Sequence, residues 1–480
     1  MKFYTNFFMR GNYVIIRGYQ NGERFTDRVE YKPTLFVPSK DNSKWSAVDG
    51  TKLKEINFGD IRDARDFVRQ YTEVEGFKIY GSTLYDYVCV HQNFTQDYDT
   101  EYVKLVTVDI EVGSEEGFPD PQLADQPVTA ITCSIDGAFY TFGTQDYKVK
   151  SDRVTYIQCS NERELLINFL RHWRQWDADV VTGWNISGFD IPYLYNRMTK
   201  VLGEKEAKRL SPVGLINERE YEVFNRKQID VEMVGITTLD YLDLYRKFTY
   251  SQQESYRLDH IAHVELGEKK LDYSEVETLH QLYKLDYDKF IDYNIKDVDL
   301  VNKLEDKMKL IDMALAIAYD AKVNYKDVFT QVRMWDVLIH NWLYDRSIAI
   351  PPKERKEKNT QYAGAYVKDP QVGMHKWVMS FDLNSLYPHL IMQYNISPDT
   401  FIERMRSDVT VDGLLKGIKP EVEGDVCVAA NGTCYDKSEQ GFLPEMMEKM
   451  YNDRVKAKKS MLEAQNKLEE VNRRLNEINK

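Results

Sequence analysis

The chain has 480 residues, which is too long for one hydrophobic core, so the sequence predicts about two to four domains. A hydrophobic content of 42% and a charged content of 29% are ordinary for a soluble protein. Neither a membrane-spanning apolar run of roughly 18 residues nor a secretion signal is found, so we expect a cytosolic protein with no membrane partner. The five scattered cysteines argue against a disulfide framework, and the net charge of −13 does not by itself favour contact with nucleic-acid phosphates.

Along the chain, short strands give way to alternating strands and helices. Up to about residue 103 the pattern is one of short strands, with Asn21-Gly22 as a hairpin-like turn. Beyond it we predict strands at 103–112, 128–142 (two strands, broken at Asp136-Gly137) and 179–182, and helices at 161–176, from about 191, and at 287–321. Strands that alternate with helices indicate an α/β sheet.

The last part of the chain has a different pattern. A dense run of charges at 353–358 is typical of a solvated linker, and 376–383 has the pattern of a strand. No Gly or Pro follows Pro444, and apolar residues recur at coiled-coil spacing after it, so we expect one long helix whose apolar seam needs a partner.

Two carboxylates lie near the end of the first strand of the α/β region. Asp109 and Glu111 are two residues apart, so their side chains project from the same face of the strand, while Val108 and Ile110 point to the other face. A solvated strand end would explain this pair equally well if it stood alone. At the carboxyl end of a strand, however, it lies where open α/β sheets place their ligands.

Further polar residues follow in a fixed order. Asp190 comes just before a helical segment, where it could serve only as a helix N-cap, and Tyr293 and Asp297 share one face of a helix, where they could be a surface pair. Together with Asp109 and Glu111 they form an oxygen-rich set without His or Cys, which suits Mg²⁺ or Mn²⁺ rather than zinc. Two such ions roughly 4 Å apart can activate water and stabilise the leaving oxygen of a phosphodiester.

These residues match the three motifs of a known family residue by residue. The sequence resembles the DnaQ-like (ribonuclease-H-like) proofreading 3′→5′ exonuclease of family B DNA polymerases. The resemblance implies that Asp109, Glu111, Asp190 and Asp297 hold two metal ions and that Tyr293 orients the attacking water. The second motif also contains Asn185 and Phe189, which the resemblance assigns to binding of the substrate strand.

Residues 380–388, Ser-Phe-Asp-Leu-Asn-Ser-Leu-Tyr-Pro, resemble motif A of the polymerase site in the same family. By that resemblance, Asp382 holds the catalytic Mg²⁺ ions and Tyr387 lies under the incoming sugar. The resemblance assigns further residues to the nucleotide or the template, namely Leu383, Ser385, Leu386, Tyr362, Gly364, Arg454 and Lys458.

The resemblance is closest to the replicative polymerases of large tailed phages, which would place the protein in the host cytoplasm. It implies an α/β multidomain fold with a ribonuclease-H-like exonuclease domain at 104–309 and a mixed α+β N-terminal domain at 1–103, to which 310–353 returns. The first part of the palm would span 354–440, and the first helix of the fingers would span 441–480. The implied partners are primer–template DNA, single-stranded DNA and a deoxynucleoside triphosphate.

Two motifs of the family are missing: the Lys-x-x-x-Asn-Ser-x-Tyr-Gly motif of the fingers and the Asp-Thr-Asp-Ser motif with the second catalytic aspartate. One aspartate cannot hold two Mg²⁺ ions for nucleotidyl transfer. We therefore hypothesise a split polymerase in which a second polypeptide supplies the rest of fingers, palm and thumb. Three alternatives remain open at this point: a truncated polymerase, a stand-alone exonuclease with a vestigial palm, and a non-catalytic nucleic-acid-binding module.

Overall fold

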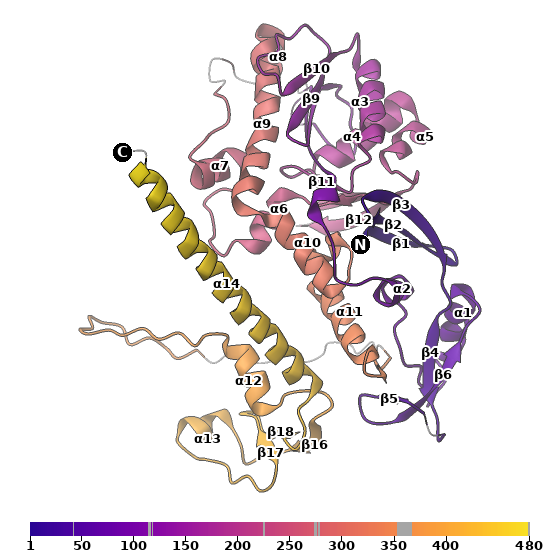
Figure 1. The fold of residues 1–480 in the computed structure, drawn as a ribbon, viewed down its shortest axis with the longest axis vertical. Helices are drawn as coiled ribbons and strands as arrows, with labels where there is room; N and C mark the ends of the chain where they lie inside the picture. The colour runs from indigo at the N-terminus through magenta and orange to yellow at the C-terminus, as the bar shows by residue number, and fades with distance from the viewer. Residues whose placement is uncertain are drawn as a thin grey trace. The chain divides into compact units, whose positions relative to one another are not determined.

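The computed structural model describes residues 1–41, 43–113, 117, 119–223, 226–272, 276, 279–352 and 367–478. The chain divides into two compact units (Figure 1). The first unit consists of Met1–Leu35, Asn57–Phe77 and Ser82–Trp342, and the second consists of Phe36–Ile56, Lys78–Gly81 and Leu343–Lys480. The expected mixed α/β multidomain fold is confirmed, whereas the domain boundaries given above stay predictions.

The first unit begins with an antiparallel three-stranded sheet in the order β1-β2-β3. Its strands are β1 (Lys2–Arg10), β2 (Tyr13–Gln20) and β3 (Glu23–Glu30). The predicted turn at Asn21-Gly22 joins β2 to β3, and both residues have positive φ (52° and 85°), as a tight hairpin turn with the twist of the strands requires. Two helices of the same unit follow, α1 (Ile61–Tyr71) and α2 (Tyr85–Asn93).

The centre of the first unit is a six-stranded sheet in the order β10-β9-β8-β7-β11-β14. Its strands are β7 (Leu105–Val112), β8 (Val128–Ile135), β9 (Ala138–Gly143), β10 (Val154–Gln158), β11 (Val180–Thr182) and β14 (Thr237–Thr238). β7 pairs antiparallel with β8 and parallel with β11, so the carboxyl ends of β7, β11 and β14 lie at one edge of the sheet. The strands predicted at 103–112, at 128–142 with a break at Asp136-Gly137, and at 179–182 are confirmed.

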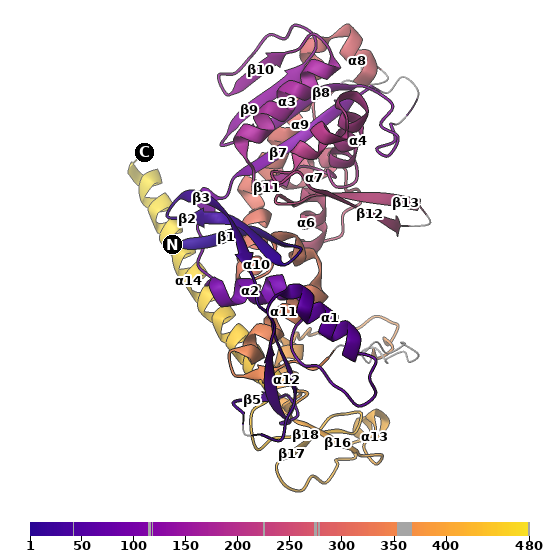
Figure 2. The same ribbon diagram turned by 90° about the vertical axis from the view of Figure 1, so that its right-hand side faces the viewer.

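Helices cover both faces of this sheet (Figure 2). On one face α3 (Glu162–Trp176) and α4 (Asp190–Leu202) share a buried core with alternate side chains of β7 and β8, among them Val108 and Ile131. On the other face α9 (Tyr287–Met308) and α8 (Leu279–Leu285) pack over Ala130 of β8. Because alternate residues of a strand point to opposite faces, Asp109 and Glu111 lie on the α9 face.

The first unit contains further helices and one further hairpin outside this sheet. They are α5 (Glu204–Ala207), the hairpin of β12 (Ile216–Val223) and β13 (Arg226–Met233), α6 (Tyr241–Phe248), α7 (Leu258–Leu266), α10 (Leu310–Ala321) and most of α11 (Gln331–Tyr344). The predicted helical stretch 287–321 forms two helices, α9 and α10, because Lys309 adopts a left-handed conformation (φ 54°) between them.

The second unit contains two small sheets and a long helix. A four-stranded sheet consists of β4 (Thr34–Pro38), β5 (Trp45–Ala47), β6 (Lys52–Asn57) and β15 (Ile348–Ala349), and a three-stranded sheet consists of β16 (Phe401–Met405), β17 (Val426–Val428) and β18 (Thr433–Asp436). The helices are α12 (Leu386–Tyr394), α13 (Val411–Leu415) and α14 (Phe442–Ile478). The long C-terminal helix is thus confirmed, and its apolar seam residues, such as Leu468, are exposed.

One predicted element of the second unit is wrong. Residues 376–383 form no strand, and their side chains are exposed. A strand needs a neighbour that accepts and donates its backbone hydrogen bonds, and among the described residues none pairs with this segment.

Among the residues described, no helix combines the length and the apolar character required to cross a bilayer.

Candidate active site

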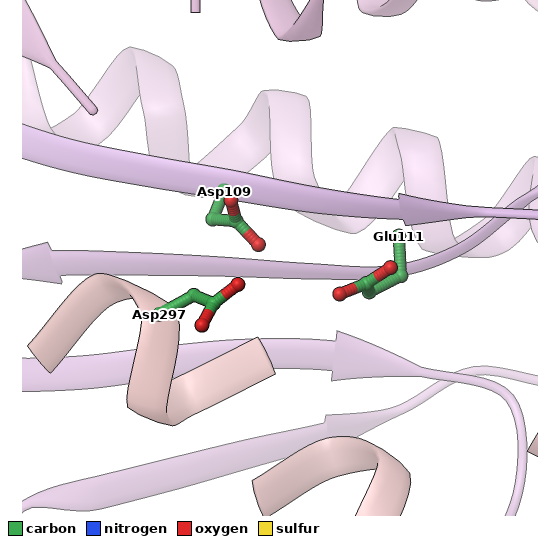
Figure 3. A group of neighbouring side chains, drawn as sticks. All are labelled: Asp109, Glu111 and Asp297. Atoms are coloured by element: carbon green, nitrogen blue, oxygen red, sulfur yellow. The ribbon is translucent and has the colours of Figure 1, made fainter. Parts of the chain in front are cut away.

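The carboxylates of Asp109 and Glu111 project from β7 toward α9, which contributes Asp297 (Figure 3). β7 fixes the first two side chains because Val108 and Ile110 are buried on the opposite face. One oxygen from each of the three carboxylates lies within 4.8 Å of the others. The structure therefore brings together three of the four metal-binding residues predicted for the exonuclease site.

Asp190, the fourth, lies next to the backbone of β7. It is 4% exposed at the first residue of α4, and its Oδ1 accepts a hydrogen bond of 3.0 Å from the backbone N–H of Ile110. The carboxylate thus holds β7 between Asp109 and Glu111. Its predicted role in holding metal stays a prediction.

Lys270 is a member of the site that the sequence analysis missed. Its ammonium group forms an ion pair with Asp297 and donates a hydrogen bond of 3.1 Å to the hydroxyl of Tyr293. The backbone N–H of Lys270 donates to Asp259 Oδ1 at 2.8 Å, which anchors the lysine in the loop after α7. In the sequence, Lys270 is one of two adjacent lysines after Glu268, and it lies outside the three exonuclease motifs.

Asn294 is a second residue that was missed. It is fully buried, and its Nδ2 donates a hydrogen bond of 2.6 Å to Asp109 Oδ2. Its place in the sequence offered a signal, since it precedes Asp297 by three residues and therefore lies on the same face of α9.

Burial and mutual repulsion make the carboxylates of the site hard to ionise. Burial raises the pKa of Asp109 well above its usual value, and the nearby Asp297, Asp190 and Glu111 raise it further. Burial raises the pKa of Glu111 to about 8, with a further contribution from Asp297, and burial raises that of Asp190 to about 7. The ammonium of Lys270 opposes the shifts of Asp109 and Glu111. Burial lowers the pKa of Lys270 itself, but Asp297, Tyr293 and Asp109 raise it, and the net shift is upward. A cation is therefore favoured here.

The residues fit a divalent cation in a second way. Asp297 Oδ1 and Asn294 Oδ1 are buried and have no hydrogen-bond partner within the described part of the chain. A buried carboxylate oxygen without a partner is costly unless a ligand satisfies it. An all-oxygen set of this kind suits Mg²⁺ or Mn²⁺.

A cavity of about 1230 Å³ opens beside these carboxylates. Asp109, Tyr293 and Asp297 form one side of it. The other lining residues include aromatic and basic side chains, namely Trp184, Arg246, Tyr256, Arg257, Lys269 and Lys270. A mixture of rings and cations is the usual lining of a site for single-stranded nucleic acid, where bases stack on rings and phosphates contact cations.

The second predicted motif forms the loop between β11 and α4. Asn185 lines the cavity in a left-handed conformation (φ 65°), and Phe189 lies at the other end of the loop, where its ring packs 5.4 Å from that of Tyr193. At Gly183 the chain passes so close to β7 that a Cβ atom would lie 2.4 Å from the carbonyl oxygen of Val108. Only glycine permits this approach.

The predicted polymerase residues lie in the second unit. Asp382, Leu383, Leu386 and Tyr387 are exposed, and Ser385 is half-buried just before α12. Arg454 of α14 donates hydrogen bonds to Asn384 Oδ1 at 3.4 Å and to Ser385 Oγ at 3.2 Å, so two of the predicted nucleotide-binding residues are in contact. Lys458 is exposed one turn further along α14, and the predicted template residues Tyr362 and Gly364 lie outside the described residues.

Comparison with known families matches two stretches of the chain. Residues 70–261 match the family described as DNA polymerase family B, exonuclease domain, and residues 326–476 match DNA polymerase family B. The chain therefore belongs to DNA polymerase family B and carries the exonuclease domain of that family.

Among individual proteins, the chain is similar to the DNA-directed DNA polymerases of two phages. It is 33% identical over 478 residues to that of Escherichia phage RB69, which covers 93% of this chain and 52% of the relative. It is 31% identical over 491 residues to that of Enterobacteria phage T4, covering 96% and 54%. A DNA polymerase of Pyrococcus glycovorans is 24% identical over 433 residues, covering 85% and 50%. The chain thus spans about half the length of these relatives.

Proposed function

We propose that this chain removes nucleotides from the 3′ ends of DNA by hydrolysis that depends on two divalent metal ions. The observation that carries the proposal is the cluster of Asp109, Glu111 and Asp297, whose oxygens lie within 4.8 Å of one another beside an open cavity. Asp190, which is bonded to the backbone of β7 at Ile110, would complete the metal-binding set. Bound there, Mg²⁺ or Mn²⁺ would supply the positive charge that activates water and stabilises the leaving oxygen.

The residues around the cluster suit the handling of a single strand. Tyr256 and Trp184 offer rings for bases, and Arg246 and Arg257 offer charges for phosphates. Tyr293 would orient the attacking water, and its hydroxyl is itself held by Lys270. The proposed substrate is a frayed 3′ end, because the terminal phosphodiester has to reach the carboxylates.

Degradation of a 5′-labelled single-stranded oligonucleotide tests this function. With Mg²⁺ the chain should give a ladder that shortens from the 3′ end, and EDTA should abolish it. Asp109→Ala combined with Glu111→Ala should abolish hydrolysis while the protein stays folded and still binds DNA. Binding without hydrolysis by the unchanged protein would favour the alternative, a non-catalytic nucleic-acid-binding module.

We also propose that the second unit carries the front of a DNA-polymerase site, with Asp382 as metal ligand and Arg454 and Lys458 as contacts of the nucleotide triphosphate. The contact of Arg454 with Ser385 supports this assignment. A second catalytic carboxylate would have to come from residues outside these 480. That it belongs to a separate polypeptide stays a prediction, which fails if the folded chain and a folded candidate fragment, once mixed, do not copy a primed template. A stand-alone exonuclease remains the alternative in that case.

A further inference from the structure

Asp240 is a buried carboxylate behind the wall of the proposed active-site cavity. It is 3% exposed, and it lies between β14 and α6, at the sheet edge where β7, β11 and β14 end. The residues that line the cavity include its sequence neighbour Leu242 but not Asp240 itself. Any effect of its carboxylate on the site would therefore have to pass through other residues.

The two oxygens of Asp240 accept three backbone hydrogen bonds. Oδ1 accepts from the N–H groups of Leu242 and Asn185, both at 3.0 Å, and Oδ2 accepts from the N–H of Ser187 at 2.9 Å. The bond to Leu242 is an ordinary N-cap of α6. The other two bonds go to a segment more than fifty residues earlier in the chain. Capping alone therefore does not account for this side chain.

The segment that Asp240 holds is the loop from Gly183 to Asp190. Its first residue, Gly183, accepts a backbone hydrogen bond of 2.9 Å from Tyr241. Its last, Asp190, binds the backbone of β7. Between these two anchors, Asn185 has a left-handed conformation (φ 65°), which Asn tolerates better than most residues with a side chain but less freely than Gly. The carboxylate of Asp240 satisfies the N–H of this residue and thereby stabilises the conformation.

We propose that Asp240 is a positioning residue of the exonuclease site, which holds Trp184 and Asn185 in the cavity wall that receives the substrate strand. This inference rests on the proposed function, because it assigns the wall to DNA. It predicts that loss of the carboxylate weakens strand binding while the three clustered carboxylates keep their affinity for metal.

Two substitutions separate the loop contacts from the helix cap. Asp240→Ser keeps an N-cap oxygen for α6 but is too short to hold the loop, and Asp240→Asn keeps the volume but places an NH₂ group against a backbone N–H. Asp243→Asn is the matched control, since Asp243 is an exposed carboxylate in the first turn of α6. For each folded variant, KM and kcat are measured on a 5′-labelled single-stranded oligonucleotide, and Mn²⁺ binding is measured by titration calorimetry.

We expect both Asp240 variants to raise KM by about 10- to 100-fold, with a smaller fall in kcat and unchanged Mn²⁺ affinity. In a double-mutant cycle, Asp240→Ser should cost less when Asn185 is already replaced by Gly, which adopts positive φ freely. An unchanged KM, an equal effect of Asp243→Asn, or loss of folding in both Asp240 variants would overturn the proposal. Absence of hydrolysis by the unchanged protein would instead count against the proposed function.

Discussion

The side-chain amide of Asn294 donates a hydrogen bond of 2.6 Å to Asp109 Oδ2, and thereby joins α9 to β7 inside the proposed metal site. The bond occupies one carboxylate oxygen of Asp109. It thereby fixes the orientation of the carboxylate group and the position of its other oxygen. Because Asn294 is fully buried, this orientation is set before any ligand enters the cavity.

We therefore predict that Asn294→Ala weakens Mn²⁺ binding by about 10- to 100-fold and slows hydrolysis to a similar extent, as is typical when a residue that orients a metal ligand is lost. Calorimetric titration with Mn²⁺ measures the first effect independently of activity. Asn302→Ala is the control, because Asn302 lies on the same helix but contacts Thr107 and Ser134 instead. It should lower stability and leave Mn²⁺ affinity unchanged, and equal effects of the two variants would contradict the prediction.

Lys270 supplies a positive charge to the carboxylate cluster. Its side chain is 26% exposed, and its ammonium group pairs with Asp297. Replacing Lys270 by Met leaves the clustered carboxylates without this counter-charge. Lys270→Met should therefore lower the free energy of unfolding of the metal-free protein by about 1–3 kcal/mol, less than for a fully buried ion pair because the lysine is partly exposed to solvent.

The measurement that checks the role of Lys270 is the rise in melting temperature caused by Mg²⁺. The rise should be larger in Lys270→Met than in the unchanged protein, because the ion replaces the missing charge. In the control Lys303→Met, the lost lysine pairs with the half-buried Glu268 and with Asp299, both outside the cluster, so the effect of Mg²⁺ should match that in the unchanged protein. Identical Mg²⁺ effects in all three proteins would count against a counter-charge role.

The raised pKa values imply a pH dependence of stability for the metal-free protein. Glu111 has a pKa of about 8 in the folded chain against 4.5 for a free side chain, so the folded state binds its proton more tightly than the unfolded state does. Its contribution to stability is therefore fully present below about pH 4.5 and is lost as the pH rises through about 8. The loss should amount to about 1.4 kcal/mol per pH unit for each proton released.

Urea unfolding in EDTA at several pH values between 5 and 8 tests this dependence. The difference in unfolding free energy between Glu111→Gln and the unchanged protein should grow with pH in favour of the variant, which carries no titratable group there. A difference that stays constant over this range would show that Glu111 is already ionised in the folded protein.

Periodicity along the chain was enough to predict β7, β8, β9, α3 and the long helix α14. The helices form their backbone hydrogen bonds internally, and each of these strands pairs with a strand next to it in the sequence. The strand at 376–383 was predicted wrongly for the opposite reason: its pattern is that of a strand, but pairing depends on a partner far away in the sequence. The break at Lys309 also escaped notice, since a single left-handed residue leaves the helical periodicity intact.

The motifs marked the carboxylates of the site but not the residues that support them. Asp109 and Glu111 are two residues apart on a strand, and Asp297 is four residues from Tyr293 on a helix, so each pair shares one face of its element. Lys270 and Asp240 come from loops, and their contacts with α9 and with the loop after β11 arise only from tertiary packing. No local pattern encodes such contacts.

Gly183 is the point at which the loop after β11 approaches β7. A Cβ atom there would lie 2.4 Å from both the carbonyl oxygen of Val108 and Cγ2 of Ile186. Gly183→Ala should therefore displace the loop, lower the free energy of unfolding by about 1–3 kcal/mol and raise KM for single-stranded DNA. In the control Gly59→Ala, the added Cβ meets only the flexible carboxylate of Asp63 at 3.3 Å, so stability should change little. If urea unfolding and hydrolysis assays gave the two variants the same values, the close approach of this loop to β7 would be refuted.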